Sequence, residues 1–87
     1  MSAASPLAAV IGLGYVGLPL ARQMCRAGVA CVGVDLDQRA VDGLNGGVSH
    51  IDDVSDDDVA AMLAAGFRAT TDPAVLESAT TIVICVP

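Results

Sequence analysis

The sequence has no lysine and no tryptophan, and its 87 residues include one Tyr, one Phe and one His. The four arginines are outnumbered by ten acidic residues, so the formal net charge is −6 and the isoelectric point is near 4.1. Nucleic acids and anionic membrane surfaces attract basic proteins, so we expect neither of them as a partner of this chain. A single phosphate group is not excluded, because backbone amides can bind it without a charged side chain.

The sequence also lacks a disulfide framework, a zinc motif and a long hydrophobic run. Its three cysteines, Cys25, Cys31 and Cys85, are widely spaced in apolar surroundings and form no CxxC pair. Residues 7–21 carry no charge, but glycines and a proline interrupt them. The run is also shorter than the roughly 20 residues that a membrane span needs. We therefore expect an unprocessed cytoplasmic protein with buried, reduced thiols and no membrane segment.

The length and composition indicate one small, well-packed unit. A chain of 8.7 kDa is too short for a two-domain enzyme. Its residues are 54% hydrophobic and 16% charged, whereas a disordered chain would have low hydrophobicity. The abundance of Val and Ala is typical of buried strands covered by small-residue helices.

Apolar runs alternate along the chain with capped, helix-like segments. The expected strands are 7–11, 30–34, 67–71 and 81–86, and the expected helices are 15–27, 38–44, 56–65 and 73–78. Such alternation predicts an α/β fold with a parallel sheet and right-handed crossovers. In a Rossmann-like doubly wound sheet the strand order would be 3-2-1-4. Because that fold normally continues with at least one further strand, we interpret residues 1–87 as a partial N-terminal dinucleotide-binding domain.

The segment from residue 12 to 17 has the spacing G-x-G-x-x-G between an expected strand and an expected helix. Gly12 would allow the tight turn, Gly14 would let a pyrophosphate approach the backbone, and Gly17 would let the helix pack closely on the sheet. A glycine-rich turn alone often serves packing only. Here the strand, loop, helix, second strand and acid all follow in order, so the segment predicts dinucleotide binding.

Asp35 ends the second expected strand, 18 residues after Gly17, where an acid that accepts the ribose hydroxyls is expected. A carboxylate at this position favours NAD over NADP, because it repels a 2′-phosphate. The alternative is that Asp35 only terminates the strand. We interpret Asp37 as a helix cap rather than as a second ribose ligand.

The remaining polar residues predict no catalytic or metal site. We interpret His50 and the neighbouring acids Asp52 and Asp53 as a solvated loop rather than a metal site. The acids at 56–58 suit the positive end of a helix dipole, and Cys85 is expected in the core. The sequence shows no Ser/His/Asp set, no paired catalytic carboxylates and no activated lysine.

Several segments resemble, in order, the opening of the UDP-glucose/GDP-mannose dehydrogenase family. They are VIGLGYVGLPLA at 10–21, GVDLD at 33–37, LNGG at 44–47, ATTD at 69–72 and ICVP at 84–87. Within that family, the loop Ser49-His50-Ile51 is similar to the Ser-Tyr-Ile loop of UDP-N-acetylglucosamine 6-dehydrogenases.

The resemblance implies roles for particular residues. Gly14, Tyr15 and Val16 would line the pyrophosphate of NAD, and Asp35 would bind the adenine ribose. The family often has a basic residue five positions after this acid, where the chain has Ala40. Arg39 is the candidate replacement, although a shift by one residue turns a helical side chain by about 100°.

For a full-length relative the resemblance implies two successive NAD-dependent oxidations of a UDP-sugar C6 alcohol to a carboxylate. The family's catalytic residues belong to later regions, so the 87-residue chain alone is expected to be inactive. A non-catalytic NAD-binding or regulatory module stays open as the alternative. In the order 3-2-1-4 the strand 81–86 lies at an edge, and its uncharged, β-branched residues predict self-association.

Overall fold

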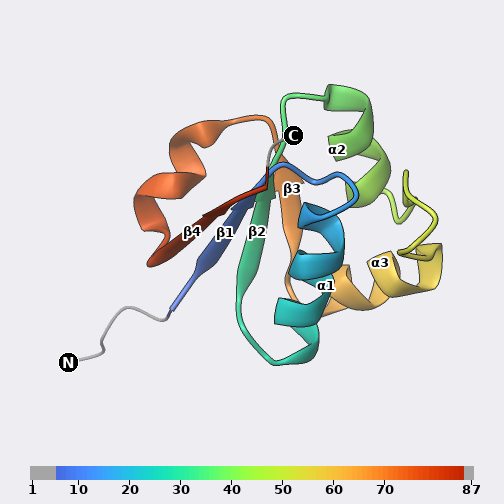
Figure 1. Ribbon diagram of the computed structural model, residues 1–87, viewed down its shortest axis with the longest axis horizontal. Coiled ribbons are helices and arrows are strands. Elements are labelled where there is room, and N and C mark those ends of the chain that lie inside the picture. Colours follow the sequence, from blue (N-terminus) through green and yellow to red (C-terminus); the bar gives the residue numbers. More distant parts are fainter. Residues whose placement is uncertain (1–5, 86–87) are drawn as a thin grey trace.

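The computed structural model describes residues 6–85 and contains one four-stranded parallel sheet with helices on both faces (Figure 1). The elements in chain order are β1 (Ala8–Ile11), α1 (Gly17–Arg26), β2 (Cys31–Val34), α2 (Gln38–Asn45), α3 (Asp56–Ala64), β3 (Arg68–Thr70), the 3-10 helix η1 (Pro73–Ser78) and β4 (Thr81–Ile84). The alternation of strands and helices read from the sequence is confirmed.

The strand order is β3-β2-β1-β4, as the sequence predicts. Ala8 of β1 pairs with Cys31 of β2 on one side and with Thr81 of β4 on the other, and all pairs are parallel. Right-handed crossovers then place α1 and α2 on one face and η1 on the opposite face, which is the arrangement in Figure 1. The direction of winding reverses beside β1, so the carboxyl ends of β1 and β4 are where this class of sheet forms a ligand crevice.

The expected boundaries differ at several elements. The short helix expected at 73–78 is a 3-10 helix with the expected bounds, and helix α1 begins at Gly17 rather than at Tyr15. Strand β4 ends at Ile84, whereas the sequence predicts an end at 86; Val86 lies outside the described residues. The amide of Cys85 still donates to the carbonyl of Ile11 at 2.7 Å, so pairing with β1 continues one bond beyond the strand.

The helix ends follow the local sequence. Gly28 and Gly66 adopt positive φ angles of 80° and 103° after α1 and α3, a conformation that glycine adopts without a steric cost. The side chain of Asp37 caps α2 by accepting from the amide of Arg39 at 3.0 Å. Ser55 and Asp58 form a capping box at the start of α3. The prediction that Asp37 caps a helix is confirmed.

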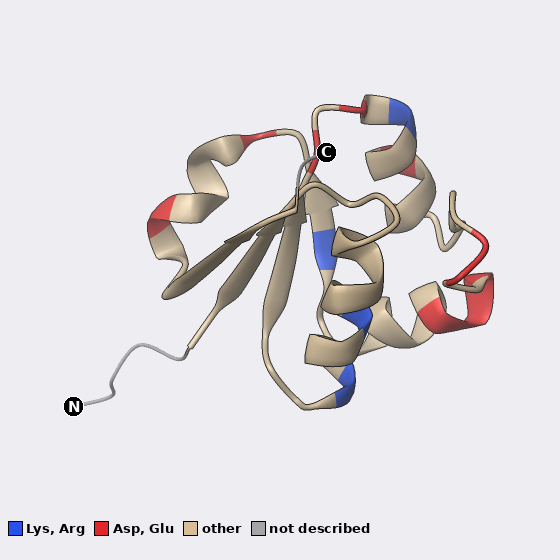
Figure 2. Cartoon of the chain, in the orientation of Figure 1, with Lys and Arg blue, Asp and Glu red and all other residues tan. Residues whose placement is uncertain are grey.

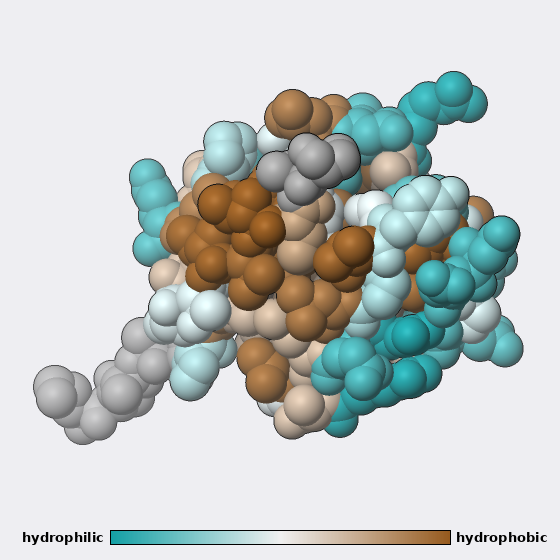
Figure 3. Space-filling model, viewed as in Figure 1, coloured by the Kyte–Doolittle hydropathy of each residue, from teal (hydrophilic) through white to brown (hydrophobic). Residues whose placement is uncertain are grey.

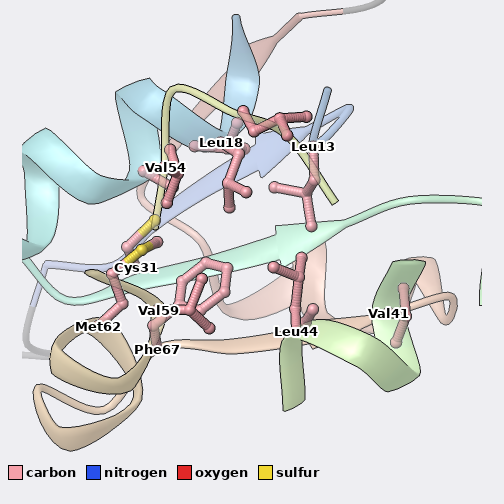
Figure 4. Close-up of a cluster of buried hydrophobic side chains, with 13 residues drawn as sticks. Leu13, Leu18, Cys31, Val41, Leu44, Val54, Val59, Met62 and Phe67 are labelled. Carbon is pink, nitrogen blue, oxygen red and sulfur yellow. The ribbon is translucent and has the colours of Figure 1, made fainter. Parts of the chain in front are cut away.

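The hydrophobic core lies between the sheet and helices α1, α2 and α3 (Figure 4). Its largest fully buried side chains include Phe67, Leu13, Leu18, Leu44 and Met62. The opposite face is less covered, since η1 has no buried residue among those described.

Burial differs between the central strand β1 and the edge strand β4. Residues Ala8, Ala9 and Val10 of β1 are buried, but Ile82 and Ile84 of β4 are 47% and 66% exposed. Figure 3 shows the resulting apolar surface over β4 and η1. Strand β1 has a strand on each side, whereas β4 pairs, among the described residues, with β1 only, and the exposure of its isoleucines depends on what covers its outer face. No helix in residues 6–85 has the length and hydrophobicity that crossing a bilayer requires.

Candidate dinucleotide-binding site

A cleft of about 530 Å³ opens at the carboxyl ends of β1 and β4. Its lining combines the glycine loop, the acid after β2 and the end of β4: Gly12, Gly14, Tyr15, Val16, Asp35, Ile84 and Cys85. Five residues that the sequence assigns to dinucleotide binding therefore meet in one cleft, although Asp35 is distant from the glycine loop in sequence.

The three glycines of the loop differ in their backbone conformation and in the space around their Cα atoms. Gly12 turns the chain off β1 with a φ of 92°, and its amide donates to the carbonyl of Val34 at 2.8 Å. A Cβ on Gly17 would overlap the carbonyl oxygen of Gly12 and would lie 3.3 Å from the Cβ of Cys85. A Cβ on Gly14 would meet no atom within 4 Å. Packing therefore explains the glycine at 17, whereas no contact within the described chain explains the glycine at 14.

The backbone amides at the start of α1 lack the capping side chain and the acidic residues that usually stabilise a helix N-terminus. Its N-cap residue, Val16, makes no side-chain capping bond, and its first turn contains no acid. Within residues 6–85, the amides of Gly14, Tyr15 and Val16 donate to no acceptor. The side chains of Tyr15 and Val16 are also largely exposed. Free amides at the positive end of a helix dipole form a site that suits an anion.

Asp35 is fixed at the edge of the same cleft. Its Oδ2 accepts from the amide of Leu13 at 2.8 Å, and its Oδ1 accepts from the amide of Asp37 at 2.9 Å. The carboxylate is thus held against the glycine loop rather than free in solvent. Each carboxylate oxygen can accept a further hydrogen bond, so hydroxyl groups in the cleft can still bind to it.

A second cavity of about 370 Å³ lies on the other side of Asp35, towards η1. Its lining is mostly apolar: Ile11, Gly12, Val34, Asp35, Leu36, Pro73 and Leu76. Gly12 and Asp35 line both cavities. A ligand with an apolar part, a sugar and a phosphate could therefore extend from one cavity to the other past Asp35.

Arg39 is not brought into the site. Its side chain is exposed on α2, lines neither cavity and makes no hydrogen bond within the described residues. A contact between Arg39 and a ligand stays a prediction from the resemblance.

Sequence reasoning missed His50. This residue is exposed, as expected for a loop, but its Nε2 lies 2.6 Å from the carbonyl oxygen of Leu13. The solvated-loop interpretation did not include this contact of the His50 ring. The two residues are 37 positions apart, and no periodicity or motif in the sequence connects them.

The cysteines do not form a nucleophilic site. Burial, together with the nearby Cys25, raises the pKa of the Cys31 thiol to about 12. Burial also raises the pKa of Cys25. Both thiols are therefore protonated near neutral pH, and a thiol in this form is a poor nucleophile. Cys85 is half-buried and forms part of the cleft wall.

The comparisons with known proteins agree with this geometry. Residues 7–87 match the model of the UDP-glucose/GDP-mannose dehydrogenase family, NAD binding domain. The chain is 44% identical over 66 residues to a UDP-N-acetyl-D-mannosamine dehydrogenase of Salmonella typhi, covering 74% of this chain and 16% of that protein. It is 42% identical over 80 residues to an NDP-N-acetyl-D-galactosaminuronic acid dehydrogenase of Ralstonia nicotianae, covering 90% of this chain and 18% of that protein.

Solved structures show the same arrangement of elements. The structure of a UDP-D-ManNAc dehydrogenase from Pyrococcus horikoshii superposes with a TM-score of 0.85 and 33% identity, covering 92% of this chain and 20% of that one. The UDP-N-acetyl-mannosamine dehydrogenase from Staphylococcus aureus gives a TM-score of 0.82 at 31% identity, covering 93% and 19% respectively. The chain thus spans about a fifth or less of the length of each relative.

The fold, the glycine loop and the acid after β2 define a Rossmann-like dinucleotide-binding domain. The match over residues 7–87 narrows this assignment to one family. The chain belongs to the UDP-glucose/GDP-mannose dehydrogenase family and corresponds to the family's NAD binding domain.

Proposed function

We propose that residues 1–87 are a partial N-terminal domain that binds NAD in the cleft at the carboxyl ends of β1 and β4. The observation that carries this proposal is the steric difference between two glycines. Gly17 is required by packing, whereas a Cβ on Gly14 would project into open space. A side chain at 14 would fill the space that a pyrophosphate needs to reach the loop amides.

The residues of the cleft fit the parts of NAD. The free amides of Gly14, Tyr15 and Val16 suit the pyrophosphate, because they can donate to its oxygens at the positive end of α1. The fixed carboxylate of Asp35 suits the adenine ribose. The apolar cavity near Leu36 and Leu76 is large enough for a base.

A competition experiment tests the cofactor and its specificity. Asp35 would accept the 2′-hydroxyl of NADH and repel the 2′-phosphate of NADPH. We expect NADH to bind the chain with saturation and to outcompete NADPH when NADH fluorescence is followed. Equal or stronger displacement by NADPH would contradict the role of Asp35, and a lack of saturable NADH binding would contradict the proposed function.

The relatives support a substrate class for the whole protein. Their names refer to UDP-N-acetyl-D-mannosamine and to an N-acetyl-D-galactosaminuronic acid. We propose a nucleotide-linked N-acetylhexosamine, a class that includes both N-acetylmannosamine and the N-acetylglucosamine suggested by the Ser49-His50-Ile51 loop. The proposed reaction is oxidation of the C6 alcohol to the carboxylate in two steps, with NAD accepting a hydride in each.

In that reaction the described residues bind and orient the cofactor. Burial raises the pKa of the Cys25 and Cys31 thiols, and the chain spans about a fifth or less of the length of each relative. We therefore propose that the 87-residue chain alone does not oxidise UDP-N-acetylmannosamine or UDP-N-acetylglucosamine. Formation of NADH with either sugar would contradict this.

The edge strand supports one further expectation from the sequence. Strand β4 is uncharged and exposes Ile82, and its described pairing is with β1 alone. We propose that the 87-residue chain associates through this edge, where unpaired backbone groups can accept another strand. Light scattering should show oligomers, and Ile82→Lys should reduce them. A monomer at all concentrations would contradict the proposal.

A further inference from the structure

The peptide units on both sides of Leu13 are held by groups from other parts of the chain. The amide of Leu13 donates to Oδ2 of Asp35 at 2.8 Å, and its carbonyl oxygen lies 2.6 Å from Nε2 of His50. The side chain of Leu13 is fully buried in the core (Figure 4). The residue that leads into the glycine loop is therefore fixed by its amide, its carbonyl and its side chain.

The bond from His50 also determines where the next amide points. The carbonyl of Leu13 and the N–H of Gly14 belong to the same planar, trans peptide, so they point in opposite directions. His50 is not part of the cleft lining, whereas Gly14 is. With the carbonyl turned towards His50, the N–H of Gly14 points away from His50, and Gly14 itself lines the cleft.

This orientation needs a partner, because glycine offers little resistance to rotation of the peptide. Gly14 has no Cβ, so its backbone tolerates conformations that other residues avoid. If the Leu13–Gly14 peptide rotated by half a turn, the carbonyl oxygen would point towards the cleft. Its partial negative charge would then repel the phosphate that the amide attracts.

The loop that carries His50 is itself anchored to α3. The amide of Ser49 donates to Oδ1 of Asp56 at 2.8 Å, and the hydroxyl of Ser49 donates to the carbonyl of Ile51 at 2.8 Å. The side chain of Ile51 is buried in the core cluster. The imidazole is thus held on a short, fixed segment rather than on a free loop.

We propose that His50 is a positioning residue for dinucleotide binding. By donating its Nε2–H to the carbonyl of Leu13, it keeps that carbonyl out of the phosphate space and keeps the amide of Gly14 in it. His50 acts through the Leu13–Gly14 peptide and has no contact with the cleft of its own. This inference rests on the proposed binding of NAD in the cleft.

The test compares two variants of His50 with a control in the same loop. His50→Ala removes the donor, His50→Gln keeps an amide donor of similar reach, and Asp52→Ala changes an exposed neighbour. Dissociation constants for NADH and for adenosine are measured by NMR titration, and thermal unfolding shows that each variant is folded.

We expect His50→Ala to weaken NADH binding about three- to tenfold, the effect of one lost hydrogen bond. Adenosine binding should change less than about twofold, because adenosine carries no phosphate for the amide of Gly14 to bind. His50→Gln should recover most of the NADH affinity, and Asp52→Ala should match the unaltered chain. Equal losses for NADH and adenosine would show a merely structural role and would overturn the inference, as would unchanged NADH binding in His50→Ala.

A second measurement does not depend on the variants. In the unaltered chain, a long-range nitrogen–proton NMR spectrum of the imidazole should show a proton on Nε2. A neutral ring with its proton on Nδ1 only would overturn the inference, since two acceptors cannot share a hydrogen bond. If the unaltered chain binds no NADH, the proposed function fails and this inference fails with it. If it binds NADH and His50→Ala binds equally well, only this inference fails.

Discussion

The first turns of α1 and α3 differ in how their amides and charges are satisfied. At α3, the hydroxyl of Ser55 accepts from the amide of Asp58 at 3.0 Å, and the carboxylate of Asp58 accepts from the amide of Ser55 at 3.0 Å. Acids fill all of the first three positions of α3. At α1, Val16 offers no cap and no acid follows it. Figure 2 shows the acidic residues gathered at the start of α3.

The two helices are otherwise directly connected. Arg22 of α1 contacts Asp58 of α3 at 3.1 Å, and Arg26 contacts the same carboxylate at 3.2 Å. A helix start whose amides have internal partners contributes to stability, whereas a start without them is available to an anionic ligand.

The largest effect on stability is expected from Gly17→Ala, because the substitution disrupts the packing of α1 against the glycine loop. The new Cβ would overlap a backbone oxygen of Gly12, which cannot move aside as a flexible side chain could. We expect a loss of about 3 kcal/mol or more in the free energy of unfolding, at the upper end for atoms inserted into a packed site. Urea denaturation measures it. A midpoint equal to that of the unaltered chain would contradict the packing role of Gly17.

The second substitution, Gly14→Val, should block ligand access to the start of α1 without disturbing the fold. In Gly14→Val the added atoms would enter the open cleft. We expect NADH binding to become undetectable by calorimetry, with an unchanged circular dichroism spectrum. Unchanged affinity would show that the glycine loop serves only as a turn.

A substitution at the start of α3 should lower stability without changing the affinity for NADH. Ser55→Ala removes the cap of α3 and should cost about 1 kcal/mol of stability. For a chain of this size that corresponds to a decrease of about 4–8 °C in Tm. The dissociation constant for NADH should stay the same, because the start of α3 lines neither cavity. A loss of NADH affinity as large as that of Gly14→Val would contradict the separation of the two helix starts.

The smallest expected effect is the dependence of stability on pH in the acid range. The hydrogen bond from the Ser55 amide, with a further contribution from Arg22, lowers the pKa of Asp58 below its usual 3.8. A carboxyl with a lowered pKa stabilises the fold above its unfolded-state pKa, and this contribution disappears as the pH falls through the folded-state pKa. We expect stability to decrease below about pH 4 and Asp58→Asn to reduce that dependence. Identical acid-unfolding profiles for the two proteins would contradict this account of Asp58.

Much of the fold could be predicted because it depends on local patterns. The alternation of apolar strands with capped helices predicts a parallel sheet, and the doubly wound dinucleotide-binding fold then predicts the order with β1 next to β4. Gly12, Gly17 and Asp35 could be placed for the same reason, since each lies at the end of a strand or the start of a helix. Their roles towards a ligand remain predictions.

The rest depends on contacts that the sequence does not encode locally. The bond between His50 and Leu13 arises only when the loop before α3 folds back over the glycine loop. The exposure of Ile82 and Ile84 depends on what covers the outer face of β4, and the apolar run itself is equally compatible with burial. Arg39 is exposed on α2 and lines neither cavity, so its contact with a ligand stays a prediction from the resemblance.

The most direct test of the account is an NMR titration of the 87-residue chain with NAD, in which the backbone amides at the two helix starts are followed. We predict that Gly14, Tyr15 and Val16 show the largest saturable shifts and that the amides of 56–58 at α3 do not move. A titration without saturation, or one with its largest shifts at 56–58, would contradict the claim that the uncapped start of α1 is the cofactor site.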